Sequence, residues 1–415
     1  MAGRRENHGI EKRPLSENAS PHGDKVSALI LAAGYSKRMG VFKPTLKIGD
    51  KTLLERVVRL FREVGIEDVI LVAGHAADQT IPIAQSCKAR VVMNGQFELG
   101  MFSSIQAGVN ALSPGCDAFF VLPVDIPLVR PQTILDLLEH YHRNDSKIIL
   151  PVFLGKKGHP PLVSACFRNE ILSFSGDGGL RAILADHEAE TTHVHVADEM
   201  VLFDLDTPAD YEALLERFHR YDVPTPRELN TLLLHKFPVP RETFQHSRAV
   251  AGVALRLASA LVRHGARLDM ELILAAAMLH DIAKGKPDHA LVGAEMISRM
   301  GFSAVGRVVA AHTNITVEDL DPVDEREVVY LADKLVQGCV VTSLQDRFEK
   351  AVLKCRDDPV AYRSMLDRFD KAEMIRRRFE TILGLSLEST LTRHMDEPGE
   401  SKIQGLLAQA WRNTV

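Results

Sequence analysis

The feature that most constrains the fold is a change of pattern near Phe218. From Val26 to this point, short apolar runs rich in Val, Ile, Leu and Phe alternate with amphipathic stretches of helical spacing. Beyond RYDVPTPREL, which carries two prolines, strand-like runs nearly disappear and the apolar residues keep helical spacing. Alternating strands and helices are typical of a mostly parallel sheet covered by helices. The sequence therefore predicts an α/β, Rossmann-like domain followed by an all-α domain.

The length of 415 residues also favours two domains, because one domain usually has roughly 100 to 200 residues. The charged first segment lacks the apolar stretch of a secretory signal, which predicts a disordered tail. The expected parts are the tail at 1–24, the α/β domain at 25–218, a linker at 219–230, the all-α domain at 231–340 and a helical extension at 341–415.

Composition excludes several classes of protein. Hydrophobic residues make up 46% and charged residues 25%, which is ordinary for a globular protein, and the formal net charge of -5 gives no reason to expect nucleic acid. The five cysteines form no CxxC pair, so a disulfide framework or cysteine zinc site is not indicated. The apolar run Leu272–Leu279 is far short of the roughly 20 residues that span a bilayer. We expect a cytoplasmic protein without a membrane partner, and we see no internal repeat, so nothing suggests a solenoid.

Local signals place the elements of the α/β half. The predicted strands are the first one with its turn at 26–34, followed by 68–74, 89–94, 117–125 and 147–153. Thr52 and Glu55 form a potential capping box for the first helix, and Pro131 suits the first turn of another helix that runs to Tyr141.

The segment LAAGYSKRMGVFKP, from Leu31 to Pro44, directly follows the first strand. Small residues at its start would let backbone amides approach a polyphosphate, basic side chains would neutralise its charge, and Ser36 could donate a hydrogen bond. The small residues are Ala32, Ala33 and Gly34, and the basic ones are Lys37, Arg38 and Lys43. This pattern indicates a nucleotide-binding loop, although a turn with solvated basic residues is the competing interpretation.

Five further segments accompany LAAGxSxRMG in order. They are GMFSSIQAG from Gly100 to Gly108, LPVDIPLV with Asp125, GHPPLV from Gly158, GDGGLR from Gly176 and LFDLDTPADYEAL with Asp206. Together they resemble the MobA-like nucleotidyltransferases, of the molybdenum cofactor cytidylyltransferase type, over roughly 26–218. The resemblance implies roles for these residues. It implies nucleotide binding by Leu31, Ala32, Ala33, Gly34, Ser36, Lys37, Ser103, Ser104 and Gly108, acceptor binding by Gly158, His159, Pro160, Gly176 and Asp177, and catalysis by Lys43, Arg38, Asp125 and Asp206.

The two aspartates suit the expected reaction. Attack on the α-phosphate of a nucleoside triphosphate builds negative charge, which Mg²⁺ held by Asp125 and Asp206 would offset. Lys43 and Arg38 would stabilise the phosphorus centre and the departing pyrophosphate. Alternatives remain open: Asp125 as a strand-end cap, Asp206 as a helix N-cap, and Asp204 as a competing ligand.

The resemblance also implies the substrates. Within the family, LAAG accompanies cytidine and LAGG accompanies guanine, so Ala33 favours CTP, with GTP as the alternative. The acceptor implied is molybdopterin in its molybdenum-loaded form, and molybdoenzymes or their chaperones are candidate partners. The KPT at Lys43 differs from the PKQ of methylerythritol phosphate cytidylyltransferases. Phe102 stands where the family usually has serine, which puts the details of base or ribose contact in doubt.

In the helical half, histidine and aspartate recur in the order H…HD…H…H…D. The residues are His246, His280, Asp281, His289, His312 and Asp333. Mixed imidazole and carboxylate ligands suit one or two divalent ions such as iron, manganese, cobalt or zinc. Singly, His289 could be a helix cap and His312 a core histidine. Lys284 could meet a phosphate or be solvated.

This order resembles the HD-family metal-dependent phosphohydrolases, over roughly 231–338. AAHT followed by YLADKL is similar to the diadenosine tetraphosphate hydrolase branch, which implies a nucleotide-like substrate. The sequence thus predicts a bifunctional enzyme. The alternative is a regulatory protein that binds cofactor and senses nucleotide through its HD half. Beyond the resemblance, RFEKAVLKCRDD and DRFDKAEMIRRRFETIL are amphipathic and carry no motif that assigns a role.

Overall fold

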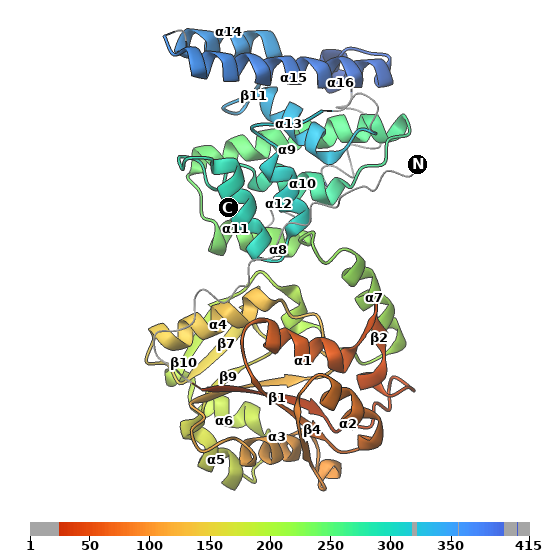
Figure 1. Ribbon diagram of the computed structural model, residues 1–415, viewed down its shortest axis with the longest axis vertical. Helices are drawn as coiled ribbons and strands as arrows, with labels where there is room; N and C mark the ends of the chain where they lie inside the picture. The colour runs from red at the N-terminus through yellow and green to blue at the C-terminus, as the bar shows by residue number, and fades with distance from the viewer. Residues whose placement is uncertain (1–24, 318–321, 356, 394–404, 406–415) are drawn as a thin grey trace, which may run out of the picture. The chain divides into compact units, whose positions relative to one another are not determined.

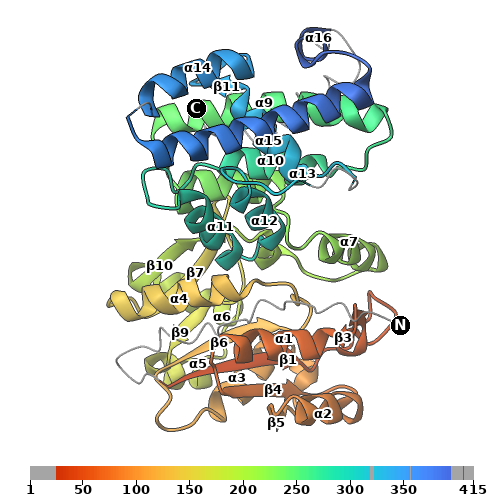
Figure 2. The same cartoon turned by 45° about the horizontal axis from the view of Figure 1, so that its top comes forward.

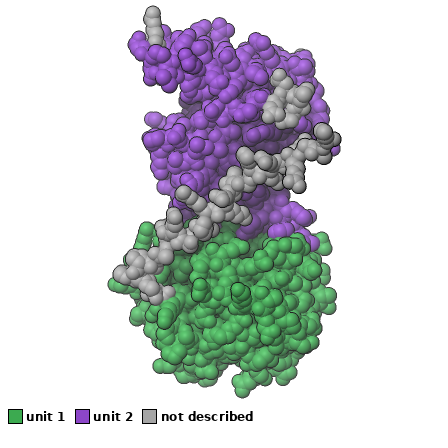
Figure 3. Space-filling model, in the orientation of Figure 1, with its two compact units in different colours: residues 1–194, 200–214 green, residues 195–199, 215–415 purple. Residues whose placement is uncertain are grey.

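The computed structural model describes residues 25–317, 322–355, 357–393 and 405. The tail expected at 1–24 lies outside the described residues. The chain forms two compact units (Figure 3): unit 1 comprises 1–194 and 200–214, and unit 2 comprises 195–199 and 215–415. In the described part of the chain, no helix combines the length and apolar character that crossing a membrane requires.

Unit 1 is built on an eight-stranded sheet of order β10-β7-β9-β6-β1-β4-β5, with β8 paired to β7. The strands are β1 (Val26–Ala32), β4 (Asp68–Ala73), β5 (Arg90–Met93), β6 (Ala118–Pro123), β7 (Ile148–Phe153), β8 (Lys156–Lys157), β9 (Leu162–Ser164) and β10 (Thr191–His195). β1 runs parallel to β4 and β6, and β4 runs parallel to β5, whereas β9 is antiparallel to β6 and β7. The expected mostly parallel α/β sheet is confirmed.

Helices cover both faces of this sheet (Figure 1). The helices α1 (Leu53–Glu63) and α4 (Pro131–Arg143) lie on one face, and α3 (Met101–Asn110), α5 (Arg168–Ser173) and α6 (Leu180–Asp186) lie on the other. The helices α2 (Ala77–Ser86) and α7 (Pro208–His219) and the small hairpin β2 (Lys47–Ile48) and β3 (Lys51–Thr52) complete the unit. Burial on both faces explains why β1 and β6 are continuous apolar runs rather than alternating ones.

The capping predicted for α1 and α4 is present. Thr52 Oγ1 accepts a hydrogen bond from the Glu55 amide at 3.2 Å, and Glu55 Oε2 accepts one from the Thr52 amide at 2.7 Å. Pro131 is the first residue of α4. The two donors and the fixed φ of proline set where these helices begin.

The strand order places a switch point beside β1. The chain moves from β1 outward to β4 and β5, and then returns through α3 to β6 on the other side of β1. Loops that leave the carboxyl ends of β1 and β6 therefore diverge and leave a crevice, which is where open α/β sheets bind ligands. The LAAG loop follows β1, and Asp125 follows β6.

Unit 2 is helical, as expected, apart from one short hairpin whose two strands have two residues each. Its helices are α8 (Pro226–Thr231), a π-helical turn (Leu232–Lys236), α9 (Arg241–Arg263), α10 (Met270–Leu279), α11 (His289–Arg299), α12 (Ser303–Ala310), α13 (Glu325–Lys334), α14 (Leu344–Cys355), α15 (Pro359–Leu383) and α16 (Leu387–Arg393). The hairpin consists of β11 (Val336–Gln337) and β12 (Val340–Val341). α10 packs against α9, α12 and α13, and its residues 273–279 are all buried, which makes it the central helix of the unit.

Candidate active sites

In unit 1, the LAAG loop leaves β1 with its small residues packed against the next loop. Ala33 is buried, and a Cβ placed on Gly74 would lie 2.8 Å from the Ala33 Cβ, so these two turns are in close contact. Ser36 takes a positive φ of 53°, and its hydroxyl accepts a hydrogen bond from the Lys43 amide at 3.1 Å. Ser36 therefore shapes the loop that delivers Lys43.

Four of the predicted catalytic side chains come together at the switch point. Lys43 Nζ lies 3.0 Å from Asp125 Oδ2 and 3.0 Å from Asp206 Oδ1, and an Arg38 nitrogen lies 2.8 Å from Asp206 Oδ1. The Lys43 side chain is 11% exposed and that of Arg38 is 72% exposed. Burial alone would lower the pKa of Lys43, but the two carboxylates outweigh it and raise that pKa. Lys43 is therefore a protonated cation shared by both carboxylates.

Asp206 does not cap the following helix. In the first turn of α7, Asp210 Oδ2 accepts hydrogen bonds from the Thr207 amide at 2.7 Å and from the Asp206 amide at 3.1 Å, and Thr207 Oγ1 accepts one from the Asp210 amide at 3.3 Å. The Asp125 carbonyl accepts a hydrogen bond from the Leu205 amide at 3.0 Å, which ties the two aspartate segments together. The Asp206 carboxylate thus faces cations rather than a helix end.

Asp204 is the third carboxyl group near this cluster. Burial raises the pKa of Asp204, and the charges of Asp125 and Asp206 add to that rise. Among the described residues, groups of three or more side chains suited to one ion occur in unit 2 and not here. A magnesium ion held by two carboxylates would therefore need further oxygen ligands, which a triphosphate and water can supply.

The serines predicted to bind nucleotide are joined by a residue that the motif analysis missed. Asn94 is buried directly after β5, and its Nδ2 donates to Ser103 Oγ at 2.9 Å and to Ser104 Oγ at 3.0 Å. A polar side chain at the carboxyl end of a parallel strand was the available signal. Gly108 differs, because a Cβ there would lie 3.0 Å from Val72 Cγ2. Its role in the structure is close packing of α3 on the sheet.

The phenylalanine that departs from the family pattern connects two parts of the site. The Phe102 ring packs edge-on against Phe174, with centroids 5.7 Å apart, and a Cβ on Gly179 would lie 3.0 Å from Phe102. Gly176 also packs against Phe174, and Asp177 is exposed. Phe102 therefore holds α3 against the GDGGLR segment.

The GHP segment is tightly enclosed. A Cβ on Gly158 would lie 2.6 Å from Val201 Cγ2, and the His159 amide donates to the Val201 carbonyl at 2.8 Å. Burial lowers the pKa of His159, against the pull of Asp204 and Asp125, so its ring is neutral. Pro160 is buried as well. In the nucleotide-binding loop predicted after β1, Leu31 and Ala32 are buried at the end of that strand. Lys37 is exposed, and its Nζ lies 4.7 Å from the Tyr35 ring centroid.

In unit 2, helix ends bring the predicted metal ligands together. His246 lies on α9 and Asp333 on α13, His280 and Asp281 directly follow α10, His289 is the first residue of α11, and His312 lies two residues beyond α12. Because α10 ends at Leu279, both His280 and Asp281 come from the turn at its carboxyl end, where they lie near the other ligands.

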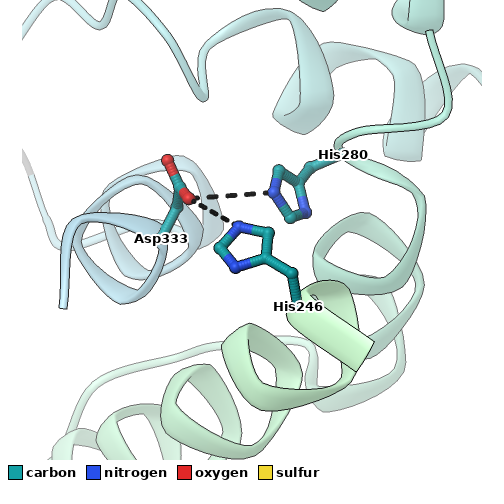
Figure 4. Close-up of side chains that lie close together, drawn as sticks. All are labelled: His246, His280 and Asp333. Carbon is teal, nitrogen blue, oxygen red and sulfur yellow. Dashed lines mark hydrogen bonds and ion pairs between the residues drawn. The ribbon is translucent and has the colours of Figure 1, made fainter. Parts of the chain in front are cut away.

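The ligands form two groups that share Asp281. His246 Nε2 lies 3.2 Å and His280 Nε2 3.8 Å from Asp333 Oδ1 (Figure 4), whereas the Nε2 atoms of His289 and His312 lie 3.2 Å apart. Asp281 Oδ2 is 3.5 Å from His280 Nε2 and 3.9 Å from His246 Nε2. Asp281 Oδ1 is 3.6 Å from His289 Nε2 and 3.8 Å from His312 Nε2. Asp281 thus belongs to the group of His289 and His312, and its second oxygen lies within 3.9 Å of His246 and His280.

The imidazoles are held in the form that binds metal. The Nδ1 atoms of His246, His280 and His312 lie 2.9, 2.7 and 2.7 Å from the backbone carbonyls of Gly338, Ala277 and Val309. A carbonyl only accepts, so each Nδ1 carries the proton and each Nε2 offers a lone pair. The buried His280 Nε2 has no hydrogen-bond partner. Burial lowers the pKa of His280. Burial, together with the nearby His280, lowers the pKa of His312 to about 3. These neutral nitrogens fit a divalent metal.

Two lysines neutralise the carboxylates from outside. Lys334 Nζ lies 2.7 Å from Asp333 Oδ2 and 2.9 Å from the His312 carbonyl, and Lys284 Nζ lies 2.5 Å from Asp281 Oδ2. Burial would raise the pKa of Asp333, but the charge of Lys334 outweighs it and holds that pKa well below its usual range. Lys284 is 54% exposed and therefore contacts both the site and solvent.

Comparison with known proteins decides the family. A model described as the MobA-like NTP transferase domain matches residues 28–192, and one described as the HD domain matches residues 243–337. A relative that is 30% identical matches this chain over 96% of its own length. The chain belongs to the MobA-like NTP transferases, and an HD domain follows the MobA-like domain along the sequence. Both are enzyme domains, a nucleotidyltransferase and a phosphohydrolase, as expected from the sequence.

Relatives of the MobA-like domain differ in activity. The 30% identical relative is the nicotine blue oxidoreductase of Paenarthrobacter nicotinovorans, which covers 46% of this chain. The molybdenum cofactor cytidylyltransferase of Escherichia coli (strain K12) is 27% identical over 46% of this chain and 97% of its own length. The bifunctional protein GlmU of Syntrophomonas wolfei is 31% identical over 29% of this chain. The matched part is 27% of the length of that GlmU. The family alone therefore does not select a substrate.

Solved structures also resemble the MobA-like domain. That of Rv0371c from Mycobacterium tuberculosis H37Rv is 24% identical, and the likeness covers 47% of this chain and 100% of that one with a TM-score of 0.41.

The metal ligands of the HD domain lie at the base of a pocket of about 920 Å³. His246, Asp281, His289, His312 and Asp333 line it, together with residues from the loop after α10 and from the hairpin. Side chains of α14 and α15 also line the pocket, although the sequence indicated no role for either helix. What indicates such a role is a row of pocket-lining residues along one face of each helix.

Proposed function

We propose that the MobA-like domain transfers a cytidylyl group from CTP to molybdopterin in its molybdenum-loaded form and releases pyrophosphate. The observation that supports it most is the cluster of Lys43 and Arg38 with Asp125 and Asp206 beside the LAAG loop. The likeness to a molybdenum cofactor cytidylyltransferase, over 97% of that protein, supports the substrates. Molybdoenzymes or their chaperones are proposed as recipients of the product.

The charges of the cluster suit this reaction. Asp125 and Asp206 both contact one ammonium group, so the space between them accepts a cation, and they would hold Mg²⁺. Bound there, Mg²⁺ would offset the negative charge that develops on the phosphate oxygens. Arg38, which is largely exposed, would meet the β- and γ-phosphates. Lys43 is buried and protonated, and it would stabilise charge on the reacting α-phosphate.

For the HD domain we propose hydrolysis of a nucleotide-like phosphate ester. His246, His280 and Asp333 would hold one divalent ion, His289 and His312 a second, with Asp281 shared. Iron, manganese, cobalt or zinc suits this donor set, and such ions supply an activated water and charge for the phosphate oxygens. The carbonyls that accept from Nδ1 keep the rings oriented, and Lys284 stands where a phosphate oxygen could approach.

One preparation of the full-length protein tests both halves. With molybdopterin cofactor and Mg²⁺, we expect pyrophosphate release from CTP at least about tenfold faster than from GTP, and none without the acceptor. The same preparation should release orthophosphate from nucleotide esters, lose this activity to a chelator and regain it with transition metal.

The outcomes separate the alternatives. A preference for GTP would change the assigned nucleotide from CTP to GTP and leave the proposed nucleotidyl transfer in place. Absence of any transfer from either nucleotide would overturn the proposed reaction of the MobA-like domain. Metal binding and nucleotide binding without hydrolysis would favour the sensor hypothesis for the HD domain.

A further inference from the structure

The helices α14 and α15 carry two copies of one short sequence. SLQDRFEKA occupies 343–351 and SMLDRFDKA occupies 364–372, and six of the nine positions are identical. The expectation that the chain contains no internal repeat is therefore wrong for this nine-residue pair, which is shorter than the supersecondary units that solenoids repeat. The two helices lie side by side in Figures 1 and 2.

Both copies turn the same stripe toward the HD pocket. Leu344, Arg347, Phe348 and Ala351 line it from α14, and Met365, Arg368, Phe369 and Ala372 line it from α15. These are positions i, i+3, i+4 and i+7 of each helix, which is one helical face. Equivalent residues meet, because the rings of Phe348 and Phe369 stack with centroids 4.1 Å apart and an angle of 32°. The two copies form one wall of the pocket.

The wall combines rings with cations. Lys350 Nζ donates to Gln337 Oε1 at 3.1 Å, and an Arg368 nitrogen donates to Ser364 Oγ at 2.8 Å. Both acceptors are neutral, and both cations line the pocket. Arg347 differs from its counterpart, because it donates to the carbonyls of Asp333 and Val336. One arginine of the repeat thus fastens α14 to the metal-binding segment, while the other stands at an exposed position.

Further basic residues line the pocket outside the two helices. Lys284 and Lys286 line it from the loop after α10, and Lys334 lies beside Asp333. Acidic lining residues are Glu242 and the two ligands Asp281 and Asp333. The volume of about 920 Å³ exceeds the need of a lone phosphate and is near the upper end of typical ligand pockets, roughly 300 to 1,000 Å³.

We infer that the repeat-bearing helices are a substrate-binding wall of the HD site, selecting nucleotides with two or more phosphates. The inference rests on the proposed phosphohydrolase function and deepens it. With the terminal phosphate at the metal ligands, Lys350 and Arg368 bind the phosphates that link it to the nucleoside, because both are cations facing the same cavity. The Phe348–Phe369 pair offers the base an apolar aromatic surface. A bare phosphate would leave this surface in contact with water.

Kinetics of the full-length holoprotein test the wall. Orthophosphate release is measured from a nucleoside triphosphate, which leaves the nucleoside diphosphate, and from ribose 5-phosphate, which lacks the base and carries no phosphate besides the scissile one. The double variant Lys350→Gln/Arg368→Gln should raise KM for the triphosphate by about tenfold or more, with kcat nearly unchanged, and leave ribose 5-phosphate hydrolysis as it was. Arg363→Gln is the matched control, an exposed arginine of α15 outside the pocket lining.

A second variant tests the rings. Phe369→Leu keeps an apolar side chain in the wall and removes one aromatic face. It should raise KM for the nucleoside triphosphate and leave KM for inorganic tripolyphosphate unchanged, whereas Tyr362→Leu, at an exposed position of α15, should alter neither. Equal effects of Phe369→Leu on both substrates, or no effect on either, would overturn the assignment of the rings to the base.

Amide hydrogen exchange distinguishes the two ways to fail. If the wall is correct, a nucleoside diphosphate slows exchange in α14 and α15 of the wild type, and less so in the double variant. Such protection without any hydrolysis would support the substrate-binding wall and contradict the proposed phosphohydrolase function. Hydrolysis with neither protection nor a change of KM in the double variant would retain the hydrolase and reject the wall.

Discussion

At the scale of single residues, Asp281 has the most consequential position in the HD domain. One of its oxygens lies within 3.9 Å of His246 and His280, and the other lies within 3.8 Å of His289 and His312. His289 by contrast belongs to one group and is 31% exposed. The two residues therefore differ in how many ions should depend on them.

We predict that Asp281→Ala removes both metals and His289→Ala removes one. Wild-type protein prepared without chelator should contain about two transition-metal ions per chain, and without the shared carboxylate the two ions would repel each other unshielded. Elemental analysis of the purified chains gives the count, and Asp370→Ala, an exposed position on α15, is the control. An unchanged metal content in Asp281→Ala would show that the histidines are structural.

At the scale of elements, the contact between α11 and α12 positions two ligands. A Cβ on Gly306 of α12 would lie 2.8 Å from the carbonyl oxygen of Ala294 on α11 and would also meet Ser298 Oγ. The helices approach this closely because position 306 has no side chain. His289 begins α11 and His312 follows α12, so the separation of the two helices sets the distance between these ligands.

Gly306→Ala should therefore loosen one half of the metal site. Overpacking of this kind typically costs about 1 to 3 kcal/mol, and we expect a lower unfolding temperature together with partial loss of the metal that His289 and His312 hold. Gly252→Ala is the matched control, because Gly252 lies within α9 and a Cβ there meets nothing within 4 Å. Its helix should be slightly stabilised. Equal behaviour of the two variants in calorimetry and metal analysis would contradict the packing argument.

At the scale of the whole molecule, each proposed site is complete within one unit. Lys43, Asp125 and Asp206 belong to unit 1, and all six candidate ligands of the HD domain belong to unit 2. The hydrophobic core around α10 is likewise made within unit 2. The limits expected for the domains, 25–218 and 231–340, remain predictions beside these compact units.

Two variants should separate the activities. Asp125→Ala should abolish nucleotidyl transfer and leave orthophosphate release unchanged, because the metal of each site is held by its own unit. Asp281→Ala should do the reverse. Both assays are run on the same folded full-length preparations, with circular dichroism to verify the fold. Loss of hydrolysis in a well-folded Asp125→Ala protein would show that the two activities are coupled.

Much of the fold was predictable because local pattern reports local structure. The burial of β1 and β6, the capping box at Thr52 and the proline that begins α4 all follow from neighbouring residues. The chemistry of the sites was predictable for a related reason. Residue types such as histidine beside aspartate, or lysine after a small-residue loop, suit few reactions, and their order along the chain is visible without a structure.

The tertiary structure alone decided which of these residues share a centre. The sequence leaves Asp206 open to interpretation as a helix cap, whereas in the structure Thr207 and Asp210 cap α7. No motif indicates Asn94, whose side chain contacts Ser103 and Ser104. The position of Asp281 between two ligand groups, and the wall made by α14 and α15, depend on contacts between segments distant in sequence. Periodicity and motifs determine the faces of each element, whereas packing determines which faces meet, and packing is a property of the whole chain.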